Sequence, residues 1–540
     1  MKPEFHNEFT YKNFLEHGKD SEFDALFDAA VSNARRTFGA KHPMFINGKE
    51  VYAQELITER SPIDGTVIGL FQKGTREHAR QAIHAAATAF DSWKNTDYAE
   101  RAALFRKVAE IFSKKKFEIG AVLSYENGKS RYESIGEVDE AIDFLHYYAN
   151  ELEINKGYSR KTSQARSTVK VDAGFQGAPS LKGEKVTIAM KPLGVFGVIA
   201  PFNFPVSISV GMSTGAMITG NTVVFKPSSS DSMTMLTGLK IYECFKEAGI
   251  PQGVFNYVSG PGSEVGDEMV VSRDVAGIAF TGSRSVGVGM ITKAYSAGLQ
   301  KKFIVEMGGK NPVVVSRSSD IDLAVSGISS AAFGFCGQKC SAVSRVYVHE
   351  SIKELFISKL VDNMRNLNIG NPLVKGIYLG PLISQNALKT YTEAVEKAKG
   401  SGRVLYGGNK VDTGLNGAYV EPTLIEVRSD HELVKKELFV PILIVQGFKD
   451  FSDALRQAND TEYGLTAGLY SKKGAEIKEF INKIQAGTVY INRETSATTG
   501  AIVGLHTFVG WKGSSVGGKG SGSKFYLQQF MREQSISLTK

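Results

Sequence analysis

The sequence predicts an α/β fold built from two successive series of strands and helices. Short apolar runs lie at 195–201, 222–227, 253–260 and 277–283, and each run ends in Gly, Pro or Ser. Helical segments separate these runs at the length of βαβ units, which favours a parallel sheet with helices on both faces. A second series follows Glu306. The chain of 540 residues is long enough for two or three structural units.

Helices are expected before, between and after the strands. Residues 1–40 form a polar lead-in of helical character. Apolar residues at three- and four-residue spacing predict further helices in 75–95, 99–115 and 134–154. The strands of the second series are predicted at 312–316, 344–350, 419–427 and 441–448. We find no internal repeat of fixed period.

The composition is that of an ordinary globular protein and excludes several function classes. The net charge of +8 is small for this length, and no dense stripe of Lys and Arg suggests a nucleic-acid partner. The apolar region 195–225 is interrupted by prolines and glycines, so no membrane span is expected. The N-terminus lacks the apolar core of a signal peptide, and three cysteines are too few for a disulfide framework. We therefore expect a cytoplasmic protein.

Two cysteines, Cys336 and Cys340, stand four residues apart and raise three alternatives. A zinc site needs three or four ligands, and the chain has neither a second cysteine pair nor a following histidine pair. A thioredoxin-like redox pair has two residues between its cysteines, whereas three stand between these. We therefore expect no metal and one nucleophilic cysteine.

Two glycine-rich segments resemble nucleotide-binding motifs. Residues 513–520 nearly match a P-loop, but Gly520 stands where the motif needs Ser or Thr, and no apolar strand precedes the segment. Residues 279–289 have a better context, with an apolar strand, a Gly-Ser turn and then a helix, whose N-terminus favours a pyrophosphate. An ordinary glycine-rich turn between strand and helix explains that pattern equally well.

Six motifs, found in the same order, resemble the aldehyde dehydrogenase superfamily. They are APFNFP at 200–205, FKPSSS at 225–230, FTGSRSVG at 280–287, VEMGGKNP at 305–312, GQKCSAVSR at 337–345 and KKELFVPILIV at 435–445. The N-terminal lead-in, the GQKCSA wording and TTGAIVG at 498–504 are similar to those members that oxidise L-glutamate γ-semialdehyde to L-glutamate. This similarity covers nearly the whole chain.

The resemblance implies a covalent mechanism with three catalytic residues. Cys340 matches the family nucleophile, and Cys336 is expected to be a bystander. The side-chain amide of Asn203 and the Cys340 N–H would hold the oxyanion, and Glu306 would activate water to hydrolyse a thioester. Because a hydrolytic base is present, we expect hydrolysis rather than transfer to coenzyme A.

For the cofactor, the resemblance implies NAD bound by a variant of the Rossmann fold. NADP is also expected to bind, because Ser229 stands where many NAD-preferring relatives have Glu. The residues implied in cofactor binding are Lys226, Ser229, Gly282, Ser283, Gly287, Glu437 and Phe439.

For the substrate, the resemblance implies an anchor for a carboxylate at Ser341, Gly500 and Ala501, with Lys339 adding positive charge. Phe204 and Phe508 match aromatic walls. Two features depart from the relatives. Thr507 and Val509 replace Pro and Gly beside Phe508, and the segment 493–499 is longer than expected. Oxidation of another aldehyde, or a non-catalytic relative with the same fold, stays an alternative.

The resemblance also implies a division of the chain and a homo-oligomer, dimer or higher. Residues 1–40 would form the N-terminal extension, and 41–154 with 191–305 the dinucleotide-binding domain. Residues 306–485 would form the catalytic domain. A β-hairpin arm for oligomerisation, with the C-terminal segment, would comprise 155–190 and 486–540.

Overall fold

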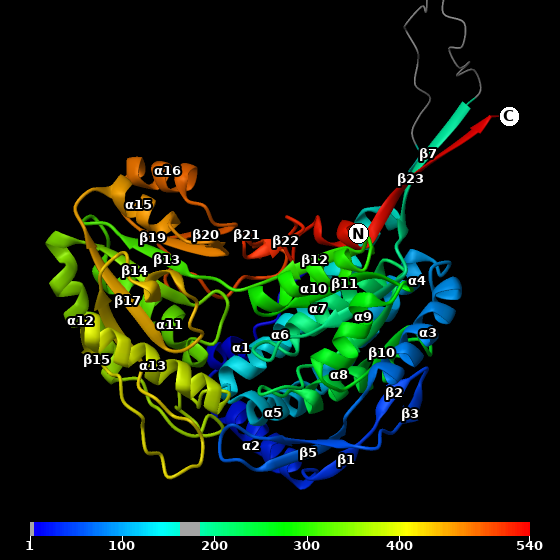
Figure 1. Ribbon diagram of the computed structural model, residues 1–540, viewed down its shortest axis with the longest axis horizontal. Coiled ribbons are helices and arrows are strands. Elements are labelled where there is room, and N and C mark those ends of the chain that lie inside the picture. The colour runs from blue at the N-terminus through cyan, green and yellow to red at the C-terminus, as the bar shows by residue number, and fades with distance from the viewer. Residues whose placement is uncertain (1–4, 162–183, 540) are drawn as a thin grey trace, which may run out of the picture.

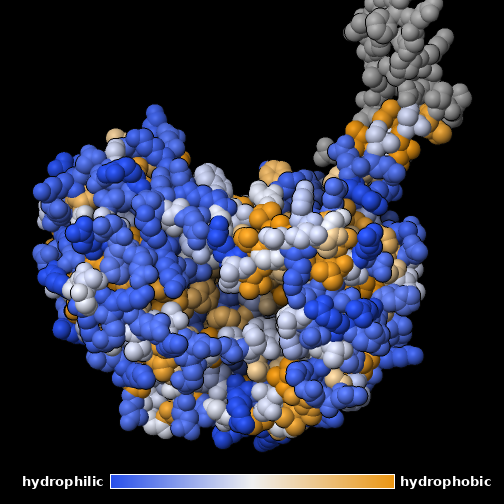
Figure 2. Space-filling model, in the orientation of Figure 1, coloured by the Kyte–Doolittle hydropathy of each residue, from blue (hydrophilic) through white to orange (hydrophobic). Residues whose placement is uncertain are grey.

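Two large β-sheets with helices packed around them form the body of the protein (Figure 1). The structure is a computed structural model that describes residues 5–161 and 184–539. The space-filling view is hollowed between the two halves (Figure 2). In the described residues, no helix is long and apolar enough to cross a bilayer, and no group of His, Cys, Asp and Glu is arranged to hold a metal ion.

The first sheet has eight strands among the described residues, in the order β22-β12-β11-β8-β9-β10-β2-β3. The five central strands are parallel: β12 (Lys302–Glu306), β11 (Val275–Thr281), β8 (Val195–Ile199), β9 (Thr222–Lys226) and β10 (Phe255–Tyr257). The antiparallel edge strands are β22 (Ser515–Val516), β2 (Met44–Ile46) and β3 (Lys49–Val51). The strand order reverses between β8 and β11, and ligands bind beyond the carboxyl ends of strands at such a switch point.

Helices between residues 76 and 296 pack on this sheet and on one another. They are α3 (Arg76–Trp93), α4 (Tyr98–Lys114), α5 (Lys116–Asn127), α6 (Arg131–Ile154), α7 (Ser207–Ile218), α8 (Met235–Ala248), α9 (Asp267–Val271) and α10 (Arg284–Ser296). Helix α7 is buried on nearly every side, because its sequence is apolar or small all round. The long helix α6 packs against α4, α5 and α7. The N-terminal helices α1 (Thr10–Glu16) and α2 (Asp20–Arg36) pack on α6 and α5 respectively.

The second sheet has seven strands among the described residues, in the order β15-β16-β17-β14-β13-β19-β20. All neighbours pair in parallel except β15 with β16. The strands are β13 (Asn311–Val315), β14 (Val343–His349), β15 (Gly402–Tyr406), β16 (Thr423–Val427), β17 (Ile442–Phe448), β19 (Thr466–Tyr470) and β20 (Thr488–Ile491). Its helices are α11 (Ile321–Phe333), α12 (Lys353–Arg365), α13 (Gln385–Ser401), α14 (Glu432–Lys435), α15 (Phe451–Asn459) and α16 (Gly474–Lys483). The α/β class with parallel strands, predicted from the alternating pattern, is confirmed.

Three small sheets complete the described structure. One joins β1 (Ala40–His42), β5 (Val67–Gln72) and β4 (Leu56–Arg60), and another joins β18 (Tyr463–Gly464) to β21 (Trp511–Lys512). In the third, β7 (Glu184–Pro192) pairs antiparallel with β23 (Met531–Thr539) and β6 (Ser159–Lys161). Strands β7 and β23 project from the body (Figure 1). Part of the expected hairpin, residues 162–183, lies outside the described residues.

The side chain of Asn221 ties three separate segments together beneath the first sheet. It is fully buried between α7 and β9. Its Oδ1 accepts hydrogen bonds from the N–H groups of Leu193 (2.7 Å) and Gly194 (2.9 Å). Its Nδ2 donates to the carbonyls of Ala216 (3.1 Å) and Phe530 (2.9 Å). One amide therefore satisfies backbone groups before β8, at the end of α7 and before β23.

We predict that Asn221→Leu lowers the free energy of unfolding by about 3 kcal/mol or more, because several buried backbone groups lose their partner at ~1–3 kcal/mol each. The measurement is the unfolding midpoint in urea, followed by circular dichroism. The control Asn366→Leu removes an amide that is exposed at the end of α12, so a change of no more than about 0.5 kcal/mol is expected. Equal losses in the two variants would contradict this role of Asn221.

Candidate active site

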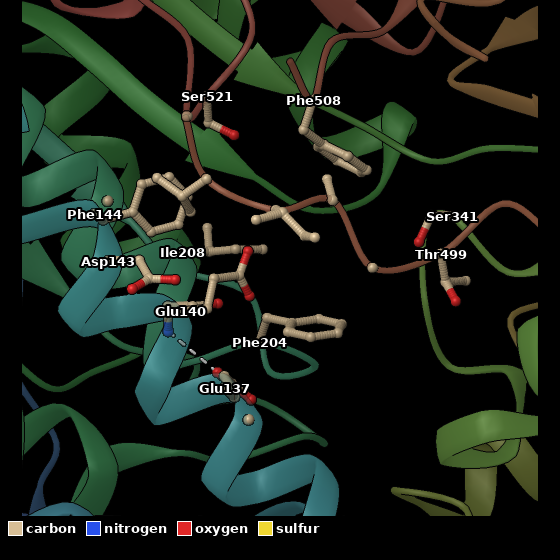
Figure 3. A pocket seen from close by; sticks show the side chains of 18 of the residues that line it. Glu137, Glu140, Asp143, Phe144, Phe204, Ile208, Ser341, Thr499, Phe508 and Ser521 are labelled. Carbon is tan, nitrogen blue, oxygen red and sulfur yellow. Dashed lines mark hydrogen bonds between the residues drawn. The ribbon is translucent and has the colours of Figure 1, made fainter. Parts of the chain in front are cut away.

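A cavity of about 530 Å³ lies between the two halves of the molecule and takes its walls from distant parts of the chain. Helices α6 and α7, the end of β12, the loop before β14 and the segment after β20 all line it. Phe204, Phe508 and Ser341 stand around it in Figure 3. The cavity brings together eight residues that the sequence analysis selected: Cys340, Glu306, Lys339, Ser341, Gly500, Ala501, Phe204 and Phe508.

Cys340 reaches the cavity from a tightly wound loop between α11 and β14. Phe335 and Cys336 have φ values of 51° and 54°, and Gly337 follows at 65°, so three successive residues are left-handed. This conformation is rare and strained for residues other than glycine. Burial raises the pKa of the Cys340 thiol to about 12, and the charges of Glu437 and Glu306 add to the rise. Hydrogen bonds from the backbone of residues 340 and 341 oppose it.

Cys336 is not part of the cavity wall. Its side chain is 1% exposed, and its Sγ donates to the Gly380 carbonyl at 3.0 Å. Burial raises the pKa of this thiol strongly. The structure therefore separates the two cysteines, with Cys340 facing the cavity and Cys336 packed in the core of the second half.

Glu306 is the last residue of β12 and presents one free carboxylate oxygen. Its Oε1 accepts a hydrogen bond from the Ser515 hydroxyl at 2.9 Å, whereas Oε2 has no partner among the described residues. Burial raises the pKa of Glu306 to about 8, and hydrogen bonds from Ser515 and the Gly510 backbone moderate the rise. A carboxyl group with a pKa near neutrality and a free oxygen has the properties of a general base.

The buried ammonium group of Lys129 holds the loop after β8. Its Nζ donates to the carbonyl of Asn203 and pairs with Glu137 of α6, and Lys129 is only 1% exposed. The same Nζ lies 3.6 Å from the centroid of the Phe204 ring and 4.8 Å from that of Phe335. Contacts of a cation with ring faces are favourable when the cation is shielded from water. Asn203 is itself buried and does not line the cavity.

The loop that carries Gly500 and Ala501 is held next to Ser341. Arg493 donates to the carbonyls of Thr499 (2.8 Å) and Gly500 (2.5 Å). The hydroxyl of Thr498, which belongs to the longer segment noted in the sequence, donates to the Ser341 carbonyl at 2.6 Å.

The N–H groups of this loop remain available. Within the described residues, the N–H groups of Gly500 and Ala501 make no hydrogen bond to the protein. Both residues line the cavity beside Ser341. Free N–H groups beside a hydroxyl make a binding site for an anion such as a carboxylate.

Thr507 and Val509, the two neighbours of Phe508 that differ from the relatives, do not line the cavity. The Thr507 carbonyl accepts from the Thr488 hydroxyl at 2.9 Å, and the Val509 N–H donates to the same hydroxyl at 3.2 Å. Of the three residues 507–509, only Phe508 lines the cavity. The exchange of Pro and Gly for Thr507 and Val509 therefore leaves the aromatic wall in place.

Lys339 lines the cavity, but its positive charge is already neutralised by a carboxylate of the protein. Its Nζ pairs with Glu133 of α6 at 2.6 Å. The Lys339–Glu133 pair therefore adds little net positive charge for a substrate carboxylate.

The residues expected around the cofactor all lie outside the cavity, and most of them are near the carboxyl ends of strands in the first sheet. Lys226 ends β9, and its Nζ donates to the Pro227 carbonyl (3.0 Å) and to the Ser229 hydroxyl (2.9 Å). Burial lowers the pKa of Lys226 to about 8. The Ser229 hydroxyl donates in turn to the Gly260 carbonyl.

The turn after β11 leads directly into the N-terminus of α10. Ser283 caps this helix by accepting from the Val286 N–H at 3.4 Å, and the Gly282 N–H donates to the Glu306 carbonyl at 3.1 Å. Gly287 lets the helix approach the sheet, because a Cβ there would lie 2.8 Å from the Met307 sulfur. The N-terminus of α10 is thus placed at the switch point of the sheet, a position favourable for phosphate.

Glu437 and Phe439 come from the second half of the chain. Glu437 Oε1 accepts from the Gly309 N–H at 2.8 Å, and burial raises the pKa of Glu437 to about 7. Phe439 has a φ of 59°, and its ring packs edge-on against Phe202 with centroids 5.8 Å apart. Both residues therefore contact segments next to Glu306 and Asn203.

The structure adds cavity residues that the sequence analysis missed. Helix α6 contributes Glu133, Glu137, Glu140, Asp143 and Phe144, which recur every three or four positions on one helix face. This spacing is present in the sequence, where it predicts a helix but not a cavity wall. The N-terminal segment contributes Glu8, Phe9, Tyr11 and Lys12. No local sequence pattern predicts that this segment reaches the cavity.

Comparison with known protein families decides the family of the chain. Residues 50–536 match the aldehyde dehydrogenase family. The chain belongs to the aldehyde dehydrogenase family. The resemblance seen in the six motifs is therefore confirmed.

Several individual aldehyde dehydrogenases are similar over the full length. The chain is 36% identical to 1-pyrroline-5-carboxylate dehydrogenase 1 of Halalkalibacterium halodurans, over 95% of each protein. It is 36% identical to 1-pyrroline-5-carboxylate dehydrogenase 2 of Bacillus subtilis, over 99% of each. The crystal structure of 1-pyrroline-5-carboxylate dehydrogenase from Thermus with bound NAD matches with a TM-score of 0.90 and 33% identity, over all of both chains.

We predict that iodoacetamide labels Cys340 in the folded protein at least about tenfold faster than Cys336 or Cys244, because access controls thiol reactivity and only Cys340 of the three lines the cavity. Timed quenching followed by peptide mass spectrometry measures the three rates. Unfolding in urea should make the three rates similar. Faster labelling of Cys336 in the folded protein would contradict the arrangement described above.

Proposed function

We propose that this aldehyde dehydrogenase oxidises L-glutamate γ-semialdehyde, the open form of 1-pyrroline-5-carboxylate, to L-glutamate with NAD. The observation that carries the proposal is that free N–H groups of Gly500 and Ala501 share one cavity with Cys340. The substrate has an aldehyde at one end and a carboxylate at the other, so it can engage both sites at once. The names of the relatives support the same substrate.

In the proposed reaction, Cys340 is the nucleophile. Hydrogen bonds from the backbone of residues 340 and 341 favour the thiolate, which forms by loss of the thiol proton to solvent. The sulfur attacks the aldehyde carbon, and the oxyanion is held by the Cys340 N–H and by the side-chain amide of Asn203, which must turn towards the cavity from its buried position. The Lys129 ammonium fixes the Asn203 backbone for this task. Loss of a hydride from the hemithioacetal leaves a thioester on Cys340.

Glu306 then acts as the general base for hydrolysis of the thioester. Its free Oε2 can accept a proton from water while Oε1 stays bound to Ser515. Attack of the water on the thioester carbon releases L-glutamate and returns the Cys340 thiol. Because β12 and Ser515 hold this base, it is in position when the thioester forms.

NAD, when bound, supplies the acceptor for the hydride. The chemistry of the donor set fits a dinucleotide: the N-terminus of α10 with Ser283 suits a pyrophosphate, and Lys226 and Glu437 suit ribose hydroxyls. Gly282, Gly287 and Phe439 shape the surrounding turns. Ser229 carries no charge that would repel a 2′-phosphate, so we propose that NADP is also used.

We also propose a homo-oligomer formed through the projecting strands. Strands β7 and β23 pair from Glu184 opposite Thr539 to Pro192 opposite Met531, and β23 is an edge strand. Three apolar side chains on these strands, Ile188, Ile536 and Leu538, are exposed. Hydrophobic surface is visible on the part of the molecule that projects from the body (Figure 2). An exposed apolar edge strand favours pairing with another chain. The cytoplasmic location expected from the sequence stays a prediction.

The proposed function is tested by comparing substrates in an assay of NADH formation. We expect kcat/KM for glutamate semialdehyde to exceed that for propanal at least about 100-fold, because several charged hydrogen bonds to the carboxylate are gained. Ser341→Ala should weaken this preference mainly through KM. Cys340→Ala should abolish activity on both aldehydes, and Cys336→Ser should retain most of it. Equal efficiency on propanal, or a preference for succinate semialdehyde, would refute the assignment.

The role of Glu306 predicts a pH dependence. A base with a pKa of about 8 must be ionised to act, so kcat should fall below pH 8, by up to about tenfold per pH unit. Glu306→Gln should release one equivalent of NADH in a burst and then turn over at least about 100-fold more slowly. Stopped-flow absorbance at neutral pH measures the burst. Neither a burst nor a trapped acyl-enzyme would show that Glu306 serves another step.

A further inference from the structure

The N-terminal segment, residues 5–12, forms part of the cavity wall and is attached to α6 by polar contacts. Thr10 donates to Asp139 of α6 from its N–H and from its hydroxyl, both at 2.8 Å. Lys116 pairs with the same carboxylate at 2.6 Å and also donates to the Thr10 hydroxyl. These contacts hold the segment against the helix without involving any other part of the cavity wall.

A different contact, made by Asn7, joins the N-terminal segment to the loop that presents the free N–H groups. This anchor loop comprises residues 499–503, all of which line the cavity. Asn7 Nδ2 donates to the Val503 carbonyl at 3.0 Å and to Asp143 Oδ2 of α6 at 2.8 Å. The two hydrogen atoms of one amide nitrogen therefore connect the anchor loop to α6.

The amide of Asn7 lies between two oxygen atoms that would repel one another without a donor. Val503 is only 3% exposed, and a buried backbone carbonyl needs a hydrogen-bond partner. Burial raises the pKa of Asp143 to about 7, and hydrogen bonds from Asn7 and from the Glu8 N–H oppose the rise. Asn7 is therefore the donor that allows a carboxylate of α6 and a carbonyl of the anchor loop to lie close together.

Apolar contacts support the same connection. The ring of Phe5 packs edge-on against that of Tyr147 in α6, with centroids 5.4 Å apart. Gly504, which follows Val503, lies so near that a Cβ there would be 2.9 Å from the Tyr147 ring and 3.1 Å from the Phe5 ring. The end of the anchor loop therefore rests on both α6 and the N-terminal segment.

The anchor loop is held at its other end by Arg493, which donates to the carbonyls of residues 499 and 500. The N–H groups of Gly500 and Ala501 lie in the chain between this attachment and the one made by Asn7. Neither attachment uses these N–H groups. Their position in the cavity is therefore fixed from both sides, while they stay available to a ligand.

We propose that Asn7 is a positioning residue for the anchor loop, through which the N-terminal segment sets the preference of the enzyme for aldehydes that carry a carboxylate. This inference rests on the proposed function and deepens it. Asn7 does not line the cavity, so it acts on a substrate only through Val503 and the N–H groups of Gly500 and Ala501. A shift of these groups by about an ångström would misalign the substrate carboxylate when the aldehyde lies at Cys340.

The test measures kcat and KM for glutamate semialdehyde and for propanal in Asn7→Leu, a variant of similar size that has no donor. We expect kcat/KM for glutamate semialdehyde to fall about tenfold, mainly through KM, because the carboxylate is held less well. The value for propanal, which has no carboxylate, should change by less than about twofold. General damage to the protein would instead lower both values.

Two control variants separate this role from attachment of the segment in general. Asn13→Leu makes the same exchange at an exposed position of α1 and should leave the values for both aldehydes unchanged. Thr10→Val, of nearly the same shape, removes the hydroxyl contacts to Asp139 and Lys116 without touching the anchor loop, and it should keep the wild-type preference. A loss of preference in Thr10→Val as large as that in Asn7→Leu would overturn the inference.

Binding of the product L-glutamate gives a measurement that does not depend on catalysis. By calorimetry, Asn7→Leu should weaken binding of L-glutamate about tenfold and leave binding of NAD unchanged. Equal losses for the two ligands would overturn the inference. If the wild-type enzyme prefers glutamate semialdehyde to propanal and Asn7→Leu keeps that preference, the inference fails while the proposed function stands. If the wild-type enzyme uses propanal equally well, the proposed function itself fails.

Discussion

The buried ammonium group of Lys129 is the interaction on which the geometry of the cavity depends. It joins α6 through Glu137, the loop after β8 through the Asn203 carbonyl, and the loop that carries Cys340 through the Phe335 ring. Removing a charge from water is expensive, so such a group is stable only with all its partners in position. Each partner is therefore confined to a narrow range of positions. The Lys129 cation thus fixes the positions of the segments around the cavity relative to one another.

The polar groups of the cavity divide into those that hold the protein together and those that are left for a ligand. Lys129, Lys339 and most carboxylates of α6 are paired with one another or with backbone groups. The second oxygen of Glu306 and the N–H groups of Gly500 and Ala501 have no partner in the described structure. Unpaired buried polar groups cost stability in an ordinary core, and their concentration in one cavity is typical of a functional site.

The strained loop at Cys340 also combines residues that hold the protein together with one residue, Cys340, that faces the cavity. Three successive left-handed residues are unfavourable in isolation, and they persist because the loop is enclosed by the core of the second half. Cys336 anchors the loop through Gly380, and Thr498 holds its other end at Ser341. The longer segment 493–499 therefore has a structural role beside Cys340. Thr507 and Val509, which also depart from the relatives, bond to Thr488 and leave the cavity unchanged.

The sequence by itself determined the α/β class and selected the residues proposed for catalysis. The alternation of apolar runs and helices predicted the parallel strands, because side-chain periodicity is a local property. Short motifs marked Cys340, Glu306 and Asn203 for the same reason, since the residues of each motif are adjacent in the chain.

Only the tertiary structure decided which groups meet across the cavity. The face of α6 with Glu140 was visible as a helical repeat, but its direction depends on packing against α4, α5 and α7. The charge of Lys339 is neutralised by Glu133, more than 200 positions away, as the separation of 206 shows. Contacts at such distances arise from the folding of whole sheets and helices around one another. A local pattern cannot specify them, because it contains no information about its distant partner.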